Sequence, residues 1–231
     1  MSWLQSRRRR VPAGVQAVSR LVDGLVDADP RVRARSARGC GAAGAEVAVP
    51  LLRERLLDPD SAVRGAAAAA LGQIGGVRCA DALMRSLRTR RLAPARLCRE
   101  LARSAPDFYL EMAVMRPENR QVRAPLALAL GLRGPSPMVG SALSSLLDGD
   151  ESERAAAYHS LGALGRAAAI PLLVRALTDD SPRIQRAAGR ALLRLGEPGP
   201  VHEAMGDAFQ RRRQPAGRRR RFLGLGWRWS R

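Results

Sequence analysis

The fold is decided by a stretch that occurs three times with little change: LLDPDSAVRGAAAAALGQIG from Leu56, LVDADPRVRARSARGCGAAG from Leu25 and LTDDSPRIQRAAGRALLRLG from Leu177. The first two copies start 31 residues apart. A fixed period of this size is typical of a protein that is built from repeated supersecondary units. The chain is therefore predicted to be an array, in which each unit buries its apolar face against its neighbours.

Three further copies lie between the stretch that begins at Leu56 and the one that begins at Leu177. LLDGDESERAAAYHSLGALG from Leu146 keeps most of the pattern. RPENRQVRAPLALALGLRG from Arg116 keeps its valine, arginine, leucine and glycine, whereas LAPARLCRELARS from Leu92 is a degenerate copy. Together these stretches predict about six units, with a capping half-unit at the end.

Each unit is predicted to be a pair of helices. The second helix begins at an Asp, Pro or Ser cap, and its small and apolar residues recur every three or four positions, which places them on one face. In the second unit these are Val63, Ala67, Ala70, Leu71 and Ile74. A glycine at each helix end fits the left-handed backbone found just past a helix. These glycines are Gly44, Gly75, Gly134, Gly165 and Gly196.

The motif order x-x-P-L-L-x-x-L, L-x-D-x-D-x-x-V-R and A-A-x-A-L-G-x-x-G resembles the short HEAT-like repeats of the phycobilisome lyase type, over roughly residues 15–195. The resemblance implies an all-α solenoid, an armadillo-like superhelix. It also implies a hydrogen-bond ladder between adjacent units, made by a turn aspartate and the arginine six residues later. The pairs that match are Asp27/Arg33, Asp58/Arg64 and Asp148/Arg154. The sixth unit has Gln185 in place of the arginine, and the fourth has Pro117 in place of the aspartate.

Composition agrees with an α-helical protein, since only 3% of the residues are aromatic. No apolar run approaches the roughly 18 residues that a membrane span needs, and no secretory signal is recognisable. A cytoplasmic protein is expected, with the membrane periphery as the alternative. The three cysteines, Cys40, Cys79 and Cys98, lack the spacing of metal ligands and are predicted to be buried spectator thiols.

Positive charge is concentrated at the two ends of the chain. The net charge is +19, and all 40 basic residues are arginine. We expect a basic tail over residues 1–12, a solenoid over 13–210 and a basic, disordered tail over 211–231. The tails are predicted to bind an anionic membrane, a nucleic acid or a partner protein, or only to solubilise the chain. The candidate tail residues are Arg7, Arg8, Arg9, Arg10, Arg218, Arg219, Arg220, Arg221, Trp227 and Trp229.

Arginines also gather on the second helices, which line the concave side of solenoids of this kind. Their spacings of three and four hold each set on one face. They are predicted to bind carboxylate or phosphate groups of a partner, the alternative being a solvated face without a ligand. The candidate contact residues are Arg35, Arg38, Arg96, Arg99, Arg103, Tyr158, His159, Arg186, Arg190 and Arg194.

Catalytic constellations are incomplete in the sequence. The deoxyhypusine hydroxylases, which this fold resembles, hold two irons with several His-Glu pairs, whereas this chain has only His202-Glu203. Nothing identifies a pigment site of the bilin lyase type, and no phosphate loop or nucleophile elbow occurs. No catalytic residue, cofactor or metal is therefore predicted.

The sequence thus favours a non-catalytic adaptor or scaffold, expected to be a monomer, that binds the acidic or mixed surface of a partner protein through its concave face. The first alternative is a nucleic-acid-binding or membrane-associated protein recruited by its basic tails. The second is an accessory enzyme of the bilin lyase or deoxyhypusine hydroxylase type.

Overall fold

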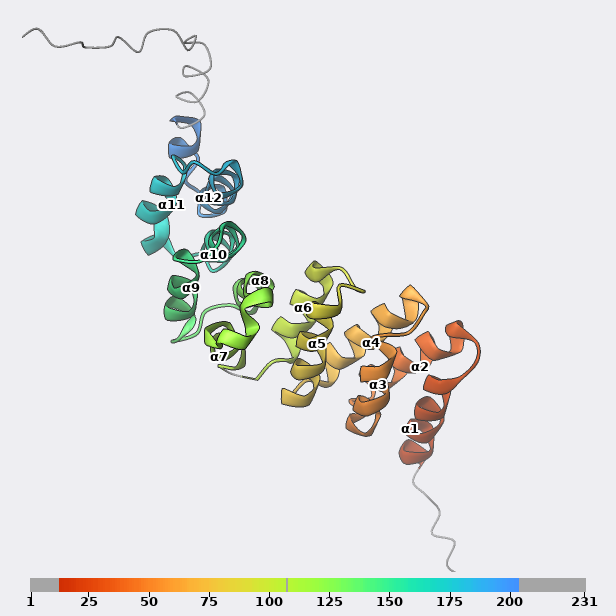
Figure 1. Cartoon of the computed structure of the whole chain (residues 1–231). Helices are drawn as coiled ribbons and strands as arrows, with labels where there is room; N and C mark the ends of the chain where they lie inside the picture. Colours follow the sequence, from red (N-terminus) through yellow and green to blue (C-terminus); the bar gives the residue numbers. More distant parts are fainter. Residues whose placement is uncertain (1–12, 107, 204–231) are drawn as a thin grey trace, which may run out of the picture.

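A curved array of helix pairs makes up the part of the chain that the computed structural model describes, residues 13–106 and 108–203 (Figure 1). Within these residues twelve α-helices precede a further helical stretch at 199–203, and no strand occurs. The prediction of an all-α solenoid of about six two-helix units is confirmed. The described part ends in helical residues 199–203, and the predicted boundary at residue 210 lies beyond it.

The first helices of the six pairs form the outer side of the curve and the second helices form its inner side (Figure 1). We call these two sets the outer row and the inner row. The outer row consists of α1 (Ala13–Asp23), α3 (Val49–Arg55), α5 (Val77–Thr89), α7 (Tyr109–Met115), α9 (Val139–Leu147) and α11 (Ile170–Ala176). The inner row consists of α2 (Pro30–Ala42), α4 (Ser61–Ile74), α6 (Pro94–Ser104), α8 (Arg123–Arg133), α10 (Glu151–Ala163) and α12 (Pro182–Arg194). Short 3-10 turns precede several of these helices.

Local sequence sets the ends of the inner helices as predicted. The side chain of Asp60 accepts hydrogen bonds from the backbone amides of Ala62 and Val63 at 2.8 and 3.0 Å, and so caps α4. Such a cap stabilises a helix by about 1 kcal/mol. At the other end of the inner helices, all five glycines singled out in the sequence have positive φ angles, from 59° at Gly44 to 108° at Gly134.

Small residues let neighbouring inner helices approach closely. A Cβ atom added at Gly162 of α10 would lie 2.5 Å from the Cα of Ala191 in α12. One added at Gly41 of α2 would lie 2.7 Å from the Cα of Ala70 in α4. Real Cβ atoms do not come so close to backbone, so these positions require glycine. Leucines fill the space between the two rows, and the three cysteines are buried and free, as predicted.

A ladder of side-chain bonds links repeats at their turns. Arg33 donates from Nε and Nη2 to the carboxylate of Asp58, both at 2.9 Å, and from Nη1 to the carbonyls of Asp27 and Ala28. Arg154 makes the same kind of ion pair with Asp179. Arg33 and Arg154 therefore each pair with the aspartate of the following repeat, 25 residues further along the chain, whereas Arg123 forms its ion pair with Glu153.

The predicted step at Arg64 departs from this pattern. Arg64 donates to the carbonyls of Asp58 and Pro59, but across the seam it reaches only the carbonyl of Arg91, at 3.2 Å. The reason is that the third repeat has Thr89, not an aspartate, 25 residues after Arg64. In the sixth repeat Gln185 donates to the carbonyl of Asp179 at 2.7 Å, which preserves the bond within the repeat.

Replacing Gly162 with alanine is expected to destabilise the protein, because the added methyl group collides with the backbone of α12. Overpacking of this kind costs about 1–3 kcal/mol, of which up to about 1 kcal/mol is offset by the helix propensity of alanine. Gly14→Ala in α1 is the matched control, since its Cβ meets no atom within 4 Å. Thermal unfolding followed by circular dichroism should show a lower Tm for Gly162→Ala alone, and equal Tm values would contradict the close packing.

Loss of the ladder carboxylate is expected to change the acid dependence of stability. Burial raises the pKa of Asp58, but the hydrogen bond and charge of Arg33 outweigh it and leave the pKa below its usual value. A lowered pKa stabilises the fold above the unfolded value of about 3.9, and this contribution disappears as the pH falls through the folded value. Asp58→Asn should therefore have a lower Tm at pH 7 and a shallower fall of Tm below about pH 4 than the natural chain. Parallel curves for the two proteins would contradict this assignment.

Candidate functional site

Exposed arginines line the inner row, and all eight that the sequence singled out there are solvent-exposed. They come from α2, α6 and α12, where spacings of three and four place them on the face that the packing leaves open. We call this set the inner stripe. Its members are Arg35, Arg38, Arg96, Arg99, Arg103, Arg186, Arg190 and Arg194.

The inner stripe forms two groups, one on α2 and α6 and the other on α12, and they are separated by α8 and α10, which contribute none of its arginines. Arg96 extends from α6 across the seam to α4. Its Nη1 atom lies so close to Gly65 of α4 that an added Cβ there would be 2.0 Å away. Ala66 of α4 is buried and contributes no charge to this surface. The arginines of α2 and α6 thus lie on either side of α4, which contributes no arginine to the stripe. Those of α12 form a separate group at the other end of the array.

Glu100 lies beneath the arginines of α6 and was missed by the sequence analysis. Its carboxylate is 3.5 Å from the guanidinium of Arg103, and the side chain packs over Gly72. Its Oε2 atom is buried and makes no hydrogen bond to the described residues. Burial raises the pKa of Glu100, while Arg103, Arg99 and Arg96 act in the opposite direction. The sequence did contain a signal for this contact. Glu100 follows Arg96 by four residues and Arg99 by one, and it precedes Arg103 by three.

His159 joins the second group of the stripe. Nη1 of Arg194 lies 3.3 Å from Nε2 of the imidazole. Since a guanidinium only donates, Nε2 acts as the acceptor and the proton of the neutral ring is on Nδ1. Burial lowers the pKa of His159, and the positive charges of Arg194 and Arg190 lower it further. The histidine is therefore neutral at pH 7 and holds Arg194 in place without competing for an anion.

Tyr158 does not take part in this surface, contrary to the expectation for the pair Tyr158/His159. Its side chain is only 8% exposed and belongs to the core. One residue of a helix corresponds to a rotation of about 100°, so adjacent residues cannot share a face. Burial also raises the pKa of its hydroxyl group.

This arrangement presents guanidinium groups that can bind anions. Within the described residues, only Arg103 and Arg194 of the inner stripe contact an acid or a histidine. The other guanidinium groups are free to form bidentate bonds with carboxylate or phosphate. In residues 13–106 and 108–203, no three His, Cys, Asp or Glu side chains are grouped to hold a metal ion. No helix in this part of the chain has both the length and the apolar character needed to cross a membrane.

The predicted tail sites lie outside the described residues. These are the arginine runs 7–10 and 218–221 together with Trp227 and Trp229.

A family model for HEAT repeats matches residues 18–105, 109–192 and 140–214, and so spans most of the chain. No curated protein matches significantly. Among solved structures, the chain is similar to the complex of CpcE and CpcF of phycocyanin lyase from Nostoc sp. PCC7120, with 23% identity, 83% of this chain and 81% of that chain covered, and a TM-score of 0.40. It is also similar to an engineered protein, with 23% identity, coverage of 83% and 61%, and a TM-score of 0.38. A second engineered protein has 19% identity, coverage of 87% and 90%, and a TM-score of 0.34.

Replacing Arg194 with glutamine is expected to raise the pKa of His159, because the nearby positive charge disfavours the imidazolium. The measurement is an NMR titration of the imidazole Cε1–H signals. His202 is the only other histidine in the chain and serves as an internal control. A His159 titration that does not move, or that moves together with His202, would contradict the contact.

Proposed function

The chain belongs to the family of HEAT-repeat proteins, and on that basis we propose that it is a non-catalytic scaffold that binds an acidic surface of a partner protein through its inner row. The observation that carries the proposal is the inner stripe. Eight exposed arginines lie on three inner helices, and the described residues provide an acidic contact for only one of them, Arg103. A repeat does not need these charges to fold, since α4 and α8 occupy the same row without them.

The chemistry of arginine supports a protein partner with exposed carboxylates. Guanidinium groups present several donors in a fixed plane and bind carboxylates in pairs of parallel hydrogen bonds. The two groups of the stripe lie on one curved surface, so a partner has to be extended or convex to touch both. Charge complementarity of this kind mainly accelerates association and selects the partner.

Binding through the basic tails is the rival proposal, because the tail segments carry 13 of the 40 arginines and no acidic residue. The two proposals differ in which part of the chain retains a ligand. Removing residues 211–231 should abolish retention of lipid vesicles or nucleic acid if the tails act, and should leave partner binding through the inner row intact.

Charge reversal on α6 tests the inner row directly. The triple variant Arg96→Glu, Arg99→Glu and Arg103→Glu is expected to weaken partner binding at least about tenfold, because attraction to the acidic surface becomes repulsion. The partner is first recovered by affinity purification with the full chain, and its affinity is then measured with purified components. The control reverses three exposed arginines outside the stripe, Arg20, Arg31 and Arg120. Equal affinities for the α6 variant and the natural chain would refute the proposed surface.

A further inference from the structure

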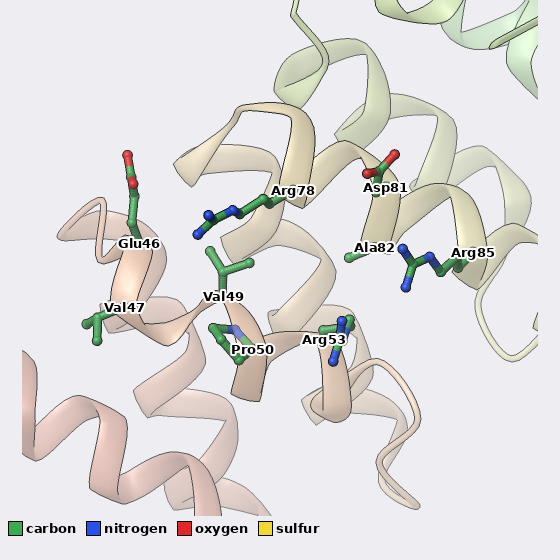
Figure 2. A pocket seen from close by; sticks show the side chains of 9 residues that line it. All are labelled: Glu46, Val47, Val49, Pro50, Arg53, Arg78, Asp81, Ala82 and Arg85. Atoms are coloured by element: carbon green, nitrogen blue, oxygen red, sulfur yellow. The ribbon is translucent and has the colours of Figure 1, made fainter.

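The outer row contains a groove that the sequence analysis did not predict. It lies between the 3-10 turn Glu46–Ala48 with α3 on one side and α5 on the other, and its main hollow has a volume of about 550 Å³ (Figure 2). Two smaller hollows, of about 240 and 210 Å³, share lining residues with it. The groove therefore follows α5 along its length, which is about 20 Å for its 13 residues.

Three arginines supply the charge of the groove. Arg53 comes from α3, whereas Arg78 and Arg85 lie seven residues apart on one face of α5. All three are exposed and make no hydrogen bond or ion pair with the described residues. Figure 2 shows the side chain of Arg78 extended above Val49, and Arg53 and Arg85 on the facing helices. The groove thus presents three free guanidinium groups.

Two acidic residues also line the groove, but neither neutralises these arginines. Asp81 accepts a hydrogen bond from the hydroxyl group of Tyr109 in α7, so its carboxylate is directed toward the next repeat. The carboxylate of Glu46 points away from Val49 and Pro50 (Figure 2). The charge that a ligand meets between α3 and α5 is therefore positive.

The repeat pattern does not require these charges. In the register that aligns Leu56 with Leu177, the sixth repeat has Val174 where Arg53 stands and Ala167 where Glu46 stands. The groove also lies at the seam where Arg64 has no carboxylate partner across the repeats. The fold therefore does not require a charge at Arg53, and binding of a ligand accounts for its convergence with Arg78 and Arg85.

We propose that this groove binds an extended acidic segment of a partner protein, independently of the inner row. The wall between the arginines is apolar, formed by Val49, Pro50 and Ala82, and Val47 at the rim is 68% exposed. Acidic side chains of the segment pair with the guanidinium groups, and an apolar side chain between them packs on the wall. At about 3.3 Å per residue, a 20 Å groove holds about six residues of extended chain.

The groove fits a peptide better than the other anionic polymers. It has no aromatic ring on which a nucleic-acid base could stack. The basic tails of this chain carry the wrong sign of charge to occupy it. Because the groove is in the outer row, its occupation leaves the inner stripe accessible.

An environment-sensitive fluorophore at the rim tests the proposal in the full-length protein. Val47→Cys provides a specific attachment point, since the three natural cysteines are buried. The probe is an acetylated six-residue peptide in which glutamate and leucine alternate. It is expected to shift the emission of the label saturably, whereas a peptide with lysine in place of glutamate should have no effect.

Two sets of substitutions in the labelled protein assign the response. Arg53→Gln, Arg78→Gln and Arg85→Gln together should raise the Kd for the acidic peptide roughly tenfold, since exposed ion pairs contribute about 0.2–1 kcal/mol each. Arg96→Gln with Arg99→Gln on the inner row should leave this Kd within about twofold. Circular dichroism establishes that all variants remain helical.

The proposal is overturned by an acidic peptide that produces no shift, or by one that binds with the same Kd after the outer arginines are replaced. A response only to a single-stranded oligonucleotide of equal charge would overturn it as well. If the inner-row variants bind the partner protein as tightly as the natural chain does, only the proposed function of the inner row is refuted. The inner-row proposal and the outer-groove proposal are therefore tested separately.

Discussion

The structure depends on the close approach of neighbouring helices in the inner row. A single helix pair cannot bury its own apolar face, so its stability comes from the next pair. At Gly41 and Gly162 the facing backbone occupies the space of a Cβ atom, which fixes how far one repeat can slide along another. This fixed register carries equivalent positions of successive repeats to the same side of the molecule. Arginines that are far apart in the sequence therefore share one open surface.

Features with local causes were predictable from the sequence. The caps at Asp60 and Ser181 and the left-handed glycine at Gly165 each depend on a few adjacent residues, and all have the expected geometry. The ladder was predictable only in part. Because Arg33 and Arg154 pair with aspartates of the following repeat, the weak step falls at Arg64, whose own repeat matches the pattern but whose following repeat has Thr89 at that position. A motif within one repeat does not contain this information.

The candidate sites divide in the same way. Exposure of the inner stripe followed from helical spacing, but the burial of Tyr158 and Glu100 depends on contacts with neighbouring helices. The outer groove depends on how α3 and α5 are spaced, which no single stretch of sequence records. The two basic surfaces also differ in kind. Two arginines of the inner stripe contact Glu100 and His159, whereas those of the outer groove border an apolar wall and make no ion pair with the described residues.

The neutral step of the ladder at Arg64 responds differently to acid from the charged step beside it at Arg33. Protonation of Asp58 converts the charged link between the first and second repeats into a weaker neutral one. The bond from Arg64 to the carbonyl of Arg91 contains no titratable acceptor and keeps its strength. Stability in such an array is close to a sum of nearest-neighbour terms. Acid therefore weakens the link between the first and second repeats but leaves the adjacent link, between the second and third, unchanged.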